Sequence, residues 1–133
     1  MTQQTLTPET LTQQSVFNAV VQHLLKQGKK SLRPDLAYDA GEGCAYLSPQ
    51  GLKCAVGCLV RPDEYNPDME GNSVGNILEL LPGRLRAHVL LLASLQRIHD
   101  LYPVACWPLQ LRILAVESGL DVSALPDLTA VPA

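Results

Sequence analysis

The sequence predicts an α+β protein, a mostly helical single domain of three to five helices with one small β-hairpin near residues 44–55. Apolar residues recur at helical spacing in several segments. Two short apolar runs flank Ser48-Pro49-Gln50-Gly51, a sequence typical of a tight turn. The chain has 133 residues, of which 47% are hydrophobic and 17% are charged, and domains cluster at about 100–150 residues. We therefore expect residues 1–133 to form one domain, with disordered ends at 1–7 and 125–133.

The first predicted helix covers residues 12–27. Its apolar face consists of Val16, Ala19, Val20 and Leu24. Thr7, Thr10 and Thr12 each offer an N-cap oxygen, and Thr10 and Gln13 have the spacing of a capping box. Gly28 is expected to end the helix in the left-handed conformation. The hairpin follows, and after it the apolar residues 56–60 predict a short buried helix that ends at Arg61-Pro62.

The strongest periodic pattern predicts a central helix from Arg84 to about Leu101. Pro108 then opens a last helix, and Gly119 is its expected terminator. The predicted core-facing residues of that last helix are Leu109, Ile113, Val116 and Leu120.

The N-terminus lacks the pattern of a secretory signal peptide, and the longest apolar run is only 89–93, whereas a membrane helix needs about 20 residues. We therefore expect a cytoplasmic protein with no membrane partner. In that compartment its four cysteines would be reduced thiols or metal ligands. The net charge of −3 argues against nucleic acid as a partner, because phosphate binding depends on clustered Lys and Arg.

Three cysteines, Cys44, Cys54 and Cys58, are the candidate zinc ligands. A helix would place Cys54 and Cys58 on one face, and Cys106 or His99 could complete a tetrahedral set. The spacing is not that of a zinc knuckle, and reduced cysteine is a common core residue. We therefore predict no cofactor, with structural zinc as the alternative.

A cysteine enzyme would use Cys54 beside Lys53 as the nucleophile and His99 as the base. Neighbouring residues on a helix point about 100° apart, so Asp100 is predicted not to orient His99. The sequence has no oxyanion loop or nucleophile elbow to accompany the pair. We therefore predict no catalytic residue and favour a protein without enzymatic activity, leaving the cysteine enzyme as an alternative.

The segment 44–70 is dense in polar and reactive side chains. Polar groups within apolar stretches must be satisfied when they are buried, so this segment either builds a hydrogen-bonded knot or lines a pocket. The candidate ligand-binding residues are Tyr46, Lys53, Cys54, Asp63, Glu64, Tyr65 and Glu70, together with His99.

The same segment carries a resemblance to a known family. The strings that carry it are Cys44-Ala45-Tyr46, residues 51–60, Pro62-Asp63-Glu64-Tyr65 and Met69-Glu70-Gly71, with further similarity in residues 16–28, in residues 95–100 and at Trp107 with Leu111. In these strings the chain resembles a family of small hypothetical proteins encoded by phages, prophages and bacterial genomes. The chain departs from the family's usual Leu-Ile-Pro-Asp-Glu by inserting Arg61 before Pro62, which puts the placement of Asp63 and Glu64 in doubt.

The resemblance implies a bacterial cytoplasm and no settled activity. Small phage proteins without a catalytic set often act by binding, so it implies a binding or inhibitor protein, with counter-defence as one role. Such a protein would block a host defence protein or sequester a small signalling molecule. The surplus of leucines in the predicted central helix adds a homodimer to the expected partners.

Overall fold

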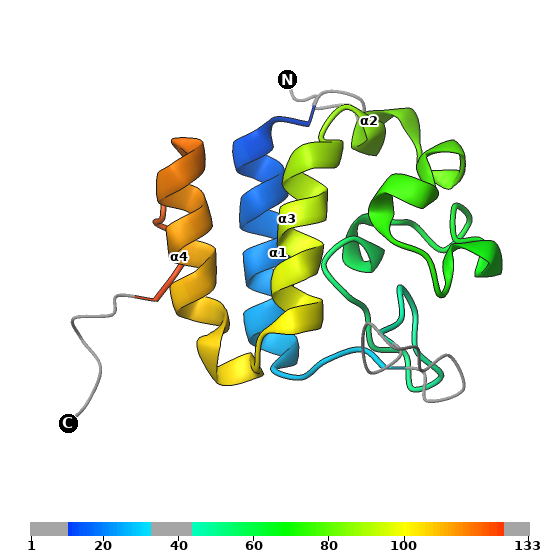
Figure 1. Ribbon diagram of the computed structural model, residues 1–133, viewed down its shortest axis with the longest axis horizontal. Coiled ribbons are helices and arrows are strands. Elements are labelled where there is room, and N and C mark those ends of the chain that lie inside the picture. Colours follow the sequence, from blue (N-terminus) through cyan, green and yellow to red (C-terminus); the bar gives the residue numbers. More distant parts are fainter. Residues whose placement is uncertain (1–10, 33–43, 127–133) are drawn as a thin grey trace, which may run out of the picture.

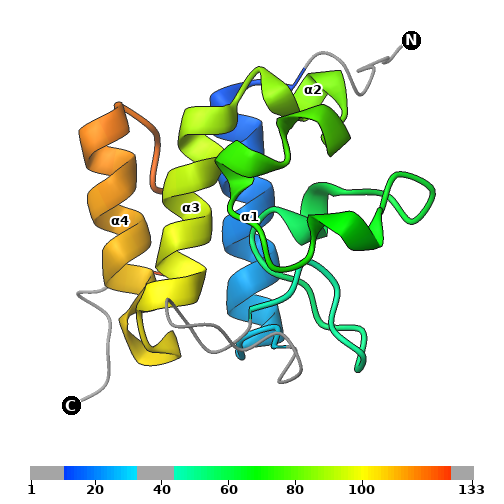
Figure 2. The same ribbon diagram turned by 45° about the vertical axis from the view of Figure 1, so that its right-hand side comes forward.

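The computed structural model describes residues 11–32 and 44–126, and three long helices form its framework. Helices α1 (Gln13–Gln27), α3 (Val89–Leu101) and α4 (Trp107–Ser118) contact one another in all three pairings (Figure 1). Helices α1 and α3 run in the same direction, and α4 runs opposite to both. Residues 44–88 lie on the side of this bundle away from α4 (Figure 2).

The described residues 44–88, which precede α3, contain only short helical elements. These are the 3₁₀ turns Gly57–Leu59, Pro67–Met69, Val74–Asn76 and Leu78–Leu80, followed by α2 (Gly83–Arg86). Within residues 11–32 and 44–126 no β-strand is present, and Leu47 and Lys53 form only an isolated antiparallel bridge. The α+β prediction is therefore wrong, and the described part of the protein is helical.

The physical reason is that a side chain takes the place of a partner strand. The carboxylate of Glu70 accepts the Tyr46 N–H at 2.9 Å and the Leu47 N–H at 3.0 Å. The turn itself forms, with the Ser48 N–H donating to the Leu52 carbonyl at 2.8 Å. Because the next residues enter the 3₁₀ turn Gly57–Leu59, the pairing stops after one bridge.

Helix α1 begins directly after Thr12, one of the threonines that could cap it. Thr12 is the N-cap: its hydroxyl accepts the Ser15 N–H at 3.0 Å, while the Ser15 hydroxyl accepts the Thr12 N–H at 2.9 Å. The capping box is therefore Thr12 with Ser15, whereas Thr10 of the predicted Thr10–Gln13 box lies outside the described residues. Gly28 ends the helix with a φ of 67°, a conformation that favours glycine.

The predicted central helix is two helices. Helix α2 ends at Arg86 and α3 begins at Val89, and His88 between them has the non-helical angles φ −117° and ψ 27°. A tertiary contact holds this break, because Nε2 of His88 lies 2.9 Å from the Leu11 carbonyl at the start of α1. Continuous apolar periodicity over 84–101 could not reveal a break that depends on a residue so distant in sequence.

Helix α4 buries a different face from the one predicted. Trp107, Leu111 and Ala115 are buried, whereas Leu109, Ile113 and Val116 are 50%, 40% and 70% exposed. Apolar side chains occupy two faces of this helix, so periodicity alone could not select the one that packs against α1 and α3. Pro108 in the first turn and Gly119 at the end, with a φ of 70°, stand where the sequence predicted them.

The core extends from the three long helices into the irregular segment. Its largest fully buried side chains include Trp107, Phe17, Leu24, Met69, Ile77 and Leu85. Leu125, predicted to lie in a disordered tail, is 7% exposed and belongs to this core. Of the other residues predicted to be disordered, 1–7 and 127–133 lie outside the described residues, as do residues 33–43 of the connector that follows α1. Among the described helices, none combines the length and the apolar character that crossing a membrane requires.

Candidate functional site

The centre of the candidate site is a buried histidine whose two ring nitrogens are both engaged. His99 is 0% exposed, and its Nε2 accepts the Ser31 N–H at 3.0 Å. Because Nε2 accepts, the ring proton is on Nδ1, which donates to Oδ1 of Asp100 at 2.8 Å. The ring also stacks on Trp107, with centroids 5.5 Å apart. His99 thus joins the connector after α1 to the ends of α3 and α4.

The hydrogen-bond network continues from Asp100 into the loops. Gln96 Nε2 donates to Oδ1 of Asp100 at 3.0 Å, and Gln96 Oε1 accepts the Val56 N–H at 3.1 Å. On the other side, the Ser31 hydroxyl donates to the Leu52 carbonyl at 2.9 Å. Each of these polar groups is satisfied within the fold, which fixes the geometry of Asp100 and Gln96.

The prediction that Asp100 does not orient His99 is wrong. The offset of about 100° between helical neighbours separates their Cβ atoms, but an imidazole and a carboxylate are long enough to converge. The Nδ1–Oδ1 distance of 2.8 Å shows that they do. Asp100 therefore fixes the tautomer of His99 directly.

Cys44 joins this pair. Its sulfur, a ring nitrogen of His99 and a carboxylate oxygen of Asp100 all lie within 4.8 Å of one another. Thiolate, imidazole and carboxylate are the three ligand types that zinc accepts in proteins. Among the described residues, this is the group of metal-ligating side chains that the fold brings together.

The predicted ligand set of Cys44, Cys54 and Cys58 is not assembled in the described structure. The Cys54 sulfur accepts the Gly57 N–H at 3.3 Å, and the Cys58 thiol donates to the Ala55 carbonyl at 3.1 Å. Both thiols are therefore held by the backbone of their own turn.

The buried thiols are also unsuited to nucleophilic attack. Burial raises the pKa of the Cys54 thiol far above its usual range, and burial raises the pKa of Cys58 to about 12. A thiol must lose its proton to act as a nucleophile, so neither residue is activated at neutral pH. The predicted pairing of Cys54 with His99 as base fails as well, because Nε2 of His99 is already occupied by the Ser31 N–H.

Three other predicted ligand-binding residues form a structural knot. Glu70 accepts the backbone N–H groups of Tyr46 and Leu47, and it also accepts the Tyr65 hydroxyl at 2.6 Å. The Tyr46 hydroxyl donates to the Asn72 carbonyl at 2.7 Å, and burial raises the pKa of Tyr46 far above its usual range. The carboxylate of Glu70 therefore holds the turn at 46–47.

Glu64 is engaged in a second structural pair. The Arg84 guanidinium donates to both carboxylate oxygens, at 2.6 Å and 2.8 Å, and also to the Leu59 carbonyl at 3.0 Å. The neighbouring Asp63 is exposed to solvent. Neither carboxylate lines a cavity beside α3 among those of the described structure.

The Glu64–Arg84 pair predicts a specific dependence of stability on pH. The hydrogen bonds from Arg84 lower the pKa of Glu64 from 4.5 to about 2. A depressed pKa stabilises the fold above the unfolded pKa, and that stabilisation is lost as the pH falls from about 4.5 to about 2. We expect Glu64→Gln to lower the free energy of unfolding at pH 7 by on the order of 1 kcal/mol, since solvent screens this partly exposed pair.

Urea unfolding at pH 7 and pH 3 checks this prediction. The difference between wild type and Glu64→Gln should shrink at pH 3, while the exposed Glu79→Gln control should differ little from wild type at either pH. An equal difference at both pH values would contradict the assignment.

The largest of the described cavities lies between α3 and the loop 72–75. Its volume is about 450 Å³. Gln96, Arg97 and Asp100 supply polar groups from α3, and Val74 and Leu101 supply apolar surface. Asp100 therefore links this cavity to the buried His99. The polar wall is fixed by the network, which is a feature of preformed ligand sites.

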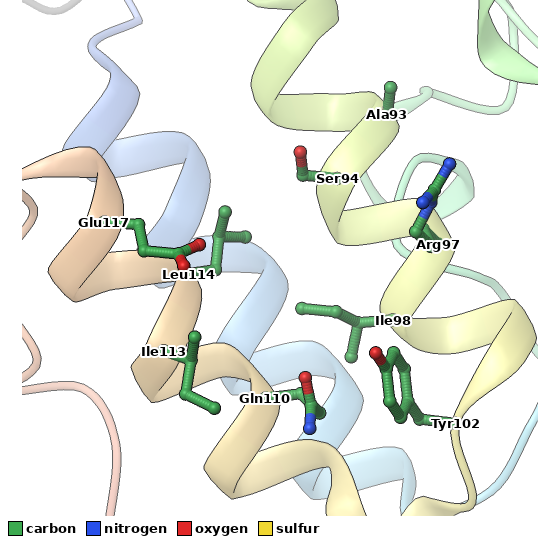
Figure 3. Close-up of a pocket in the computed structure, with 9 residues that line it drawn as sticks. All are labelled: Ala93, Ser94, Arg97, Ile98, Tyr102, Gln110, Ile113, Leu114 and Glu117. Carbon is green, nitrogen blue, oxygen red and sulfur yellow. The ribbon is translucent and has the colours of Figure 1, made fainter.

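A second cavity of about 280 Å³ lies on the other side of α3. It is a groove between α3 and α4 (Figure 3). Arg97 and Ile98 line it from α3, and Tyr102 lines it from the residue that follows α3. Gln110, Ile113 and Glu117 line it from α4. Arg97 borders both cavities, and no described residue holds its guanidinium by a hydrogen bond or an ion pair.

Of the predicted ligand-binding residues, three line a smaller cavity of about 190 Å³. These are Tyr46, Lys53 and Tyr65, with Arg61 at the same cavity. The larger site was missed, although the sequence held a signal for it. Gln96, His99 and Asp100 have the spacing i, i+3, i+4, which places them together on one side of a helix that is otherwise rich in leucine.

Comparisons of the chain with protein-family models, with curated proteins and with solved structures give no match. The resemblance to small phage and bacterial proteins therefore stays a prediction, and the function is argued from the site.

Proposed function

We propose that this chain is a non-enzymatic binding protein that takes up a small anionic molecule in the 450 Å³ cavity beside α3. The observation that carries the proposal is the guanidinium of Arg97 at that cavity, which no described residue pairs with, next to a carboxylate fixed in place by His99 and Gln96. The volume lies within the range of roughly 300–1,000 Å³ that is typical of small-molecule sites.

The chemistry of the wall defines the class of ligand. Arg97 offers a planar cation that suits a phosphate or a carboxylate. Asp100 accepts hydrogen bonds, so the ligand should also carry an N–H or O–H donor. Val74 and Leu101 contact an apolar part of the ligand. A mononucleotide has all three features.

Two observations support binding without catalysis. The lone pair on Nε2 of His99 is occupied by the Ser31 N–H, so this histidine is not available as a base. Burial keeps Cys54 and Cys58 protonated at neutral pH. The remaining polar groups at the cavity suit recognition.

The resemblance to phage proteins gives this binding role a context. A counter-defence protein that sequesters a signalling molecule needs a cavity of this kind, whereas one that blocks a host protein needs an apolar surface. The cavity favours sequestration. The exposed residues Leu109, Ile113 and Val116 are the surface that a protein partner would use if no ligand is found.

Native mass spectrometry of the untagged protein purified from cells is the first experiment. We expect an added mass that is lost when the same sample is denatured, and the charge-state series gives the oligomeric state in the same spectrum. A bare polypeptide mass, together with no change in amide resonances when AMP is added, would contradict the proposal.

A matched pair of variants locates the site. Charge-assisted hydrogen bonds contribute about 1.5–3 kcal/mol, so Arg97→Gln should weaken AMP binding about tenfold or more, as measured by NMR titration. Arg61→Gln is the control, because Arg61 is also exposed but lines the 190 Å³ cavity. If Arg61→Gln weakened binding and Arg97→Gln did not, the ligand would occupy the smaller cavity.

A further inference from the structure

We propose that Cys44, His99 and Asp100 form a zinc site, with the Cys44 thiolate, Nδ1 of His99 and a carboxylate oxygen of Asp100 as ligands. The site goes beyond the proposed binding of an anionic molecule and does not depend on it. It also differs from the set of three cysteines that the sequence suggested, because only Cys44 is shared.

Three suitable ligand atoms converge from two segments that are distant in the sequence. They lie within 4.8 Å of one another. Zinc bonds of about 2.0–2.3 Å in tetrahedral geometry separate ligand atoms by about 3.3–3.8 Å. The three side chains therefore need to move by only about 1 Å to reach that geometry. Thiolate and imidazole together favour zinc over magnesium or calcium, which prefer oxygen ligands.

His99 and Asp100 are already in short contact. Their Nδ1–Oδ1 distance of 2.8 Å encloses a single proton. A zinc ion takes the place of that proton, and the two atoms separate slightly. The imidazole proton moves to Nε2, and the Cys44 thiol proton is released to solvent, so ligand charge and protons balance.

This exchange has a consequence for the connector after α1. In the structure the Ser31 N–H donates to Nε2 of His99. With zinc at Nδ1, Nε2 carries a proton, and its N–H faces the Ser31 N–H. Two donors repel, so the Ser31 amide must turn away. The Nδ1–Oδ1 hydrogen bond and the hydrogen bond from Ser31 are both lost, a cost that the free energy of zinc ligation must exceed, and zinc binding is therefore coupled to the position of Ser31.

Among the described residues, no fourth metal-ligating side chain joins these three. Cys44 and Asp100 are partly exposed, and Asp100 also lines the 450 Å³ cavity. Three protein ligands with an open fourth position allow a water or a ligand to complete the coordination of zinc.

Metal analysis of the full-length untagged chain tests the proposal. The protein is dialysed against zinc, passed through gel filtration and measured by inductively coupled plasma mass spectrometry. We expect about one zinc per chain, a loss of at least tenfold in Cys44→Ser and in Cys44→Ala, and no change in Cys106→Ser, whose cysteine is exposed. Circular dichroism establishes that each variant is folded.

Two spectroscopic readouts separate ligation from a purely structural role. Cobalt should give a thiolate charge-transfer band in the wild type and in Cys106→Ser but not in Cys44→Ser. Zinc should also shift the amide resonance of Ser31. Equal zinc in Cys44→Ser and wild type, or no zinc in the folded wild type, would overturn the proposal.

The same samples keep the two proposals distinguishable. Arg97→Gln is expected to bind zinc like the wild type while losing affinity for AMP. Cys44→Ser is expected to lose zinc and to keep its affinity for AMP, if AMP binds without the metal. Failure of one proposal therefore leaves the other standing.

Discussion

Replacing Gly57 with alanine is expected to destabilise the protein by about 3 kcal/mol or more, because the new methyl group would collide with backbone. A Cβ on Gly57 would lie 1.9 Å from the carbonyl oxygen of Tyr46 and 2.8 Å from its carbonyl carbon. Tyr46 cannot move aside cheaply. Its N–H is held by Glu70, and its hydroxyl donates to the Asn72 carbonyl.

Gly75→Ala is the matched control for this substitution. Gly75 also lies in a 3₁₀ turn, but a Cβ there meets nothing within 4 Å. We expect its free energy of unfolding to stay within about 0.5 kcal/mol of wild type. Urea denaturation of both variants gives the comparison, and equal midpoints would show that the turn at 57 does not pack against Tyr46.

Leu111→Ala is expected to cost about 2–5 kcal/mol, whereas Leu109→Ala should change stability by less than about 0.5 kcal/mol. Both residues lie on α4. The Leu111 side chain is 0% exposed and belongs to the core, whereas Leu109 is 50% exposed. The two substitutions remove the same atoms from the same helix, and leucine and alanine have similar helix propensities. Burial is therefore the variable that differs.

The comparison of Leu111 with Leu109 tests which face of α4 is buried. Urea unfolding with a common slope for both variants gives the two free energies. A larger loss in Leu109→Ala would mean that the face containing Ile113 and Val116 is covered in solution, for example by a second copy of the chain.

The sequence predicted that the helices exist, but it did not predict all of their first and last residues. Local signals such as Gly28, Pro108 and Gly119 stand where the helices start and end, because caps depend on a few adjacent residues. The hairpin could not be predicted correctly. Its apolar runs and turn are present, but Glu70, about 24 residues away, satisfies the N–H groups that a second strand would have taken.

The candidate site shows the same division. The sequence placed most of the predicted ligand-binding residues in the dense segment 44–70. Polar residues of that segment such as Glu64 and Glu70 instead hold the fold together. His99 was among the predicted ligand-binding residues, but its partners Ser31 and Asp100 were not. Whether a cysteine is buried beside its own backbone, like Cys54, or lies beside a histidine, like Cys44, depends on contacts distant in sequence.

The sequence by itself determined the helical periodicity of α1, α3 and α4 and the residues that end them, since these depend on interactions within four or five positions. Only the tertiary structure decided which apolar face of α4 is buried, that the predicted hairpin is a turn fixed by Glu70, and that Cys44, His99 and Asp100 converge. These outcomes depend on which surfaces pack together. Burial and hydrogen-bond satisfaction are properties of the whole fold, and no local pattern encodes them.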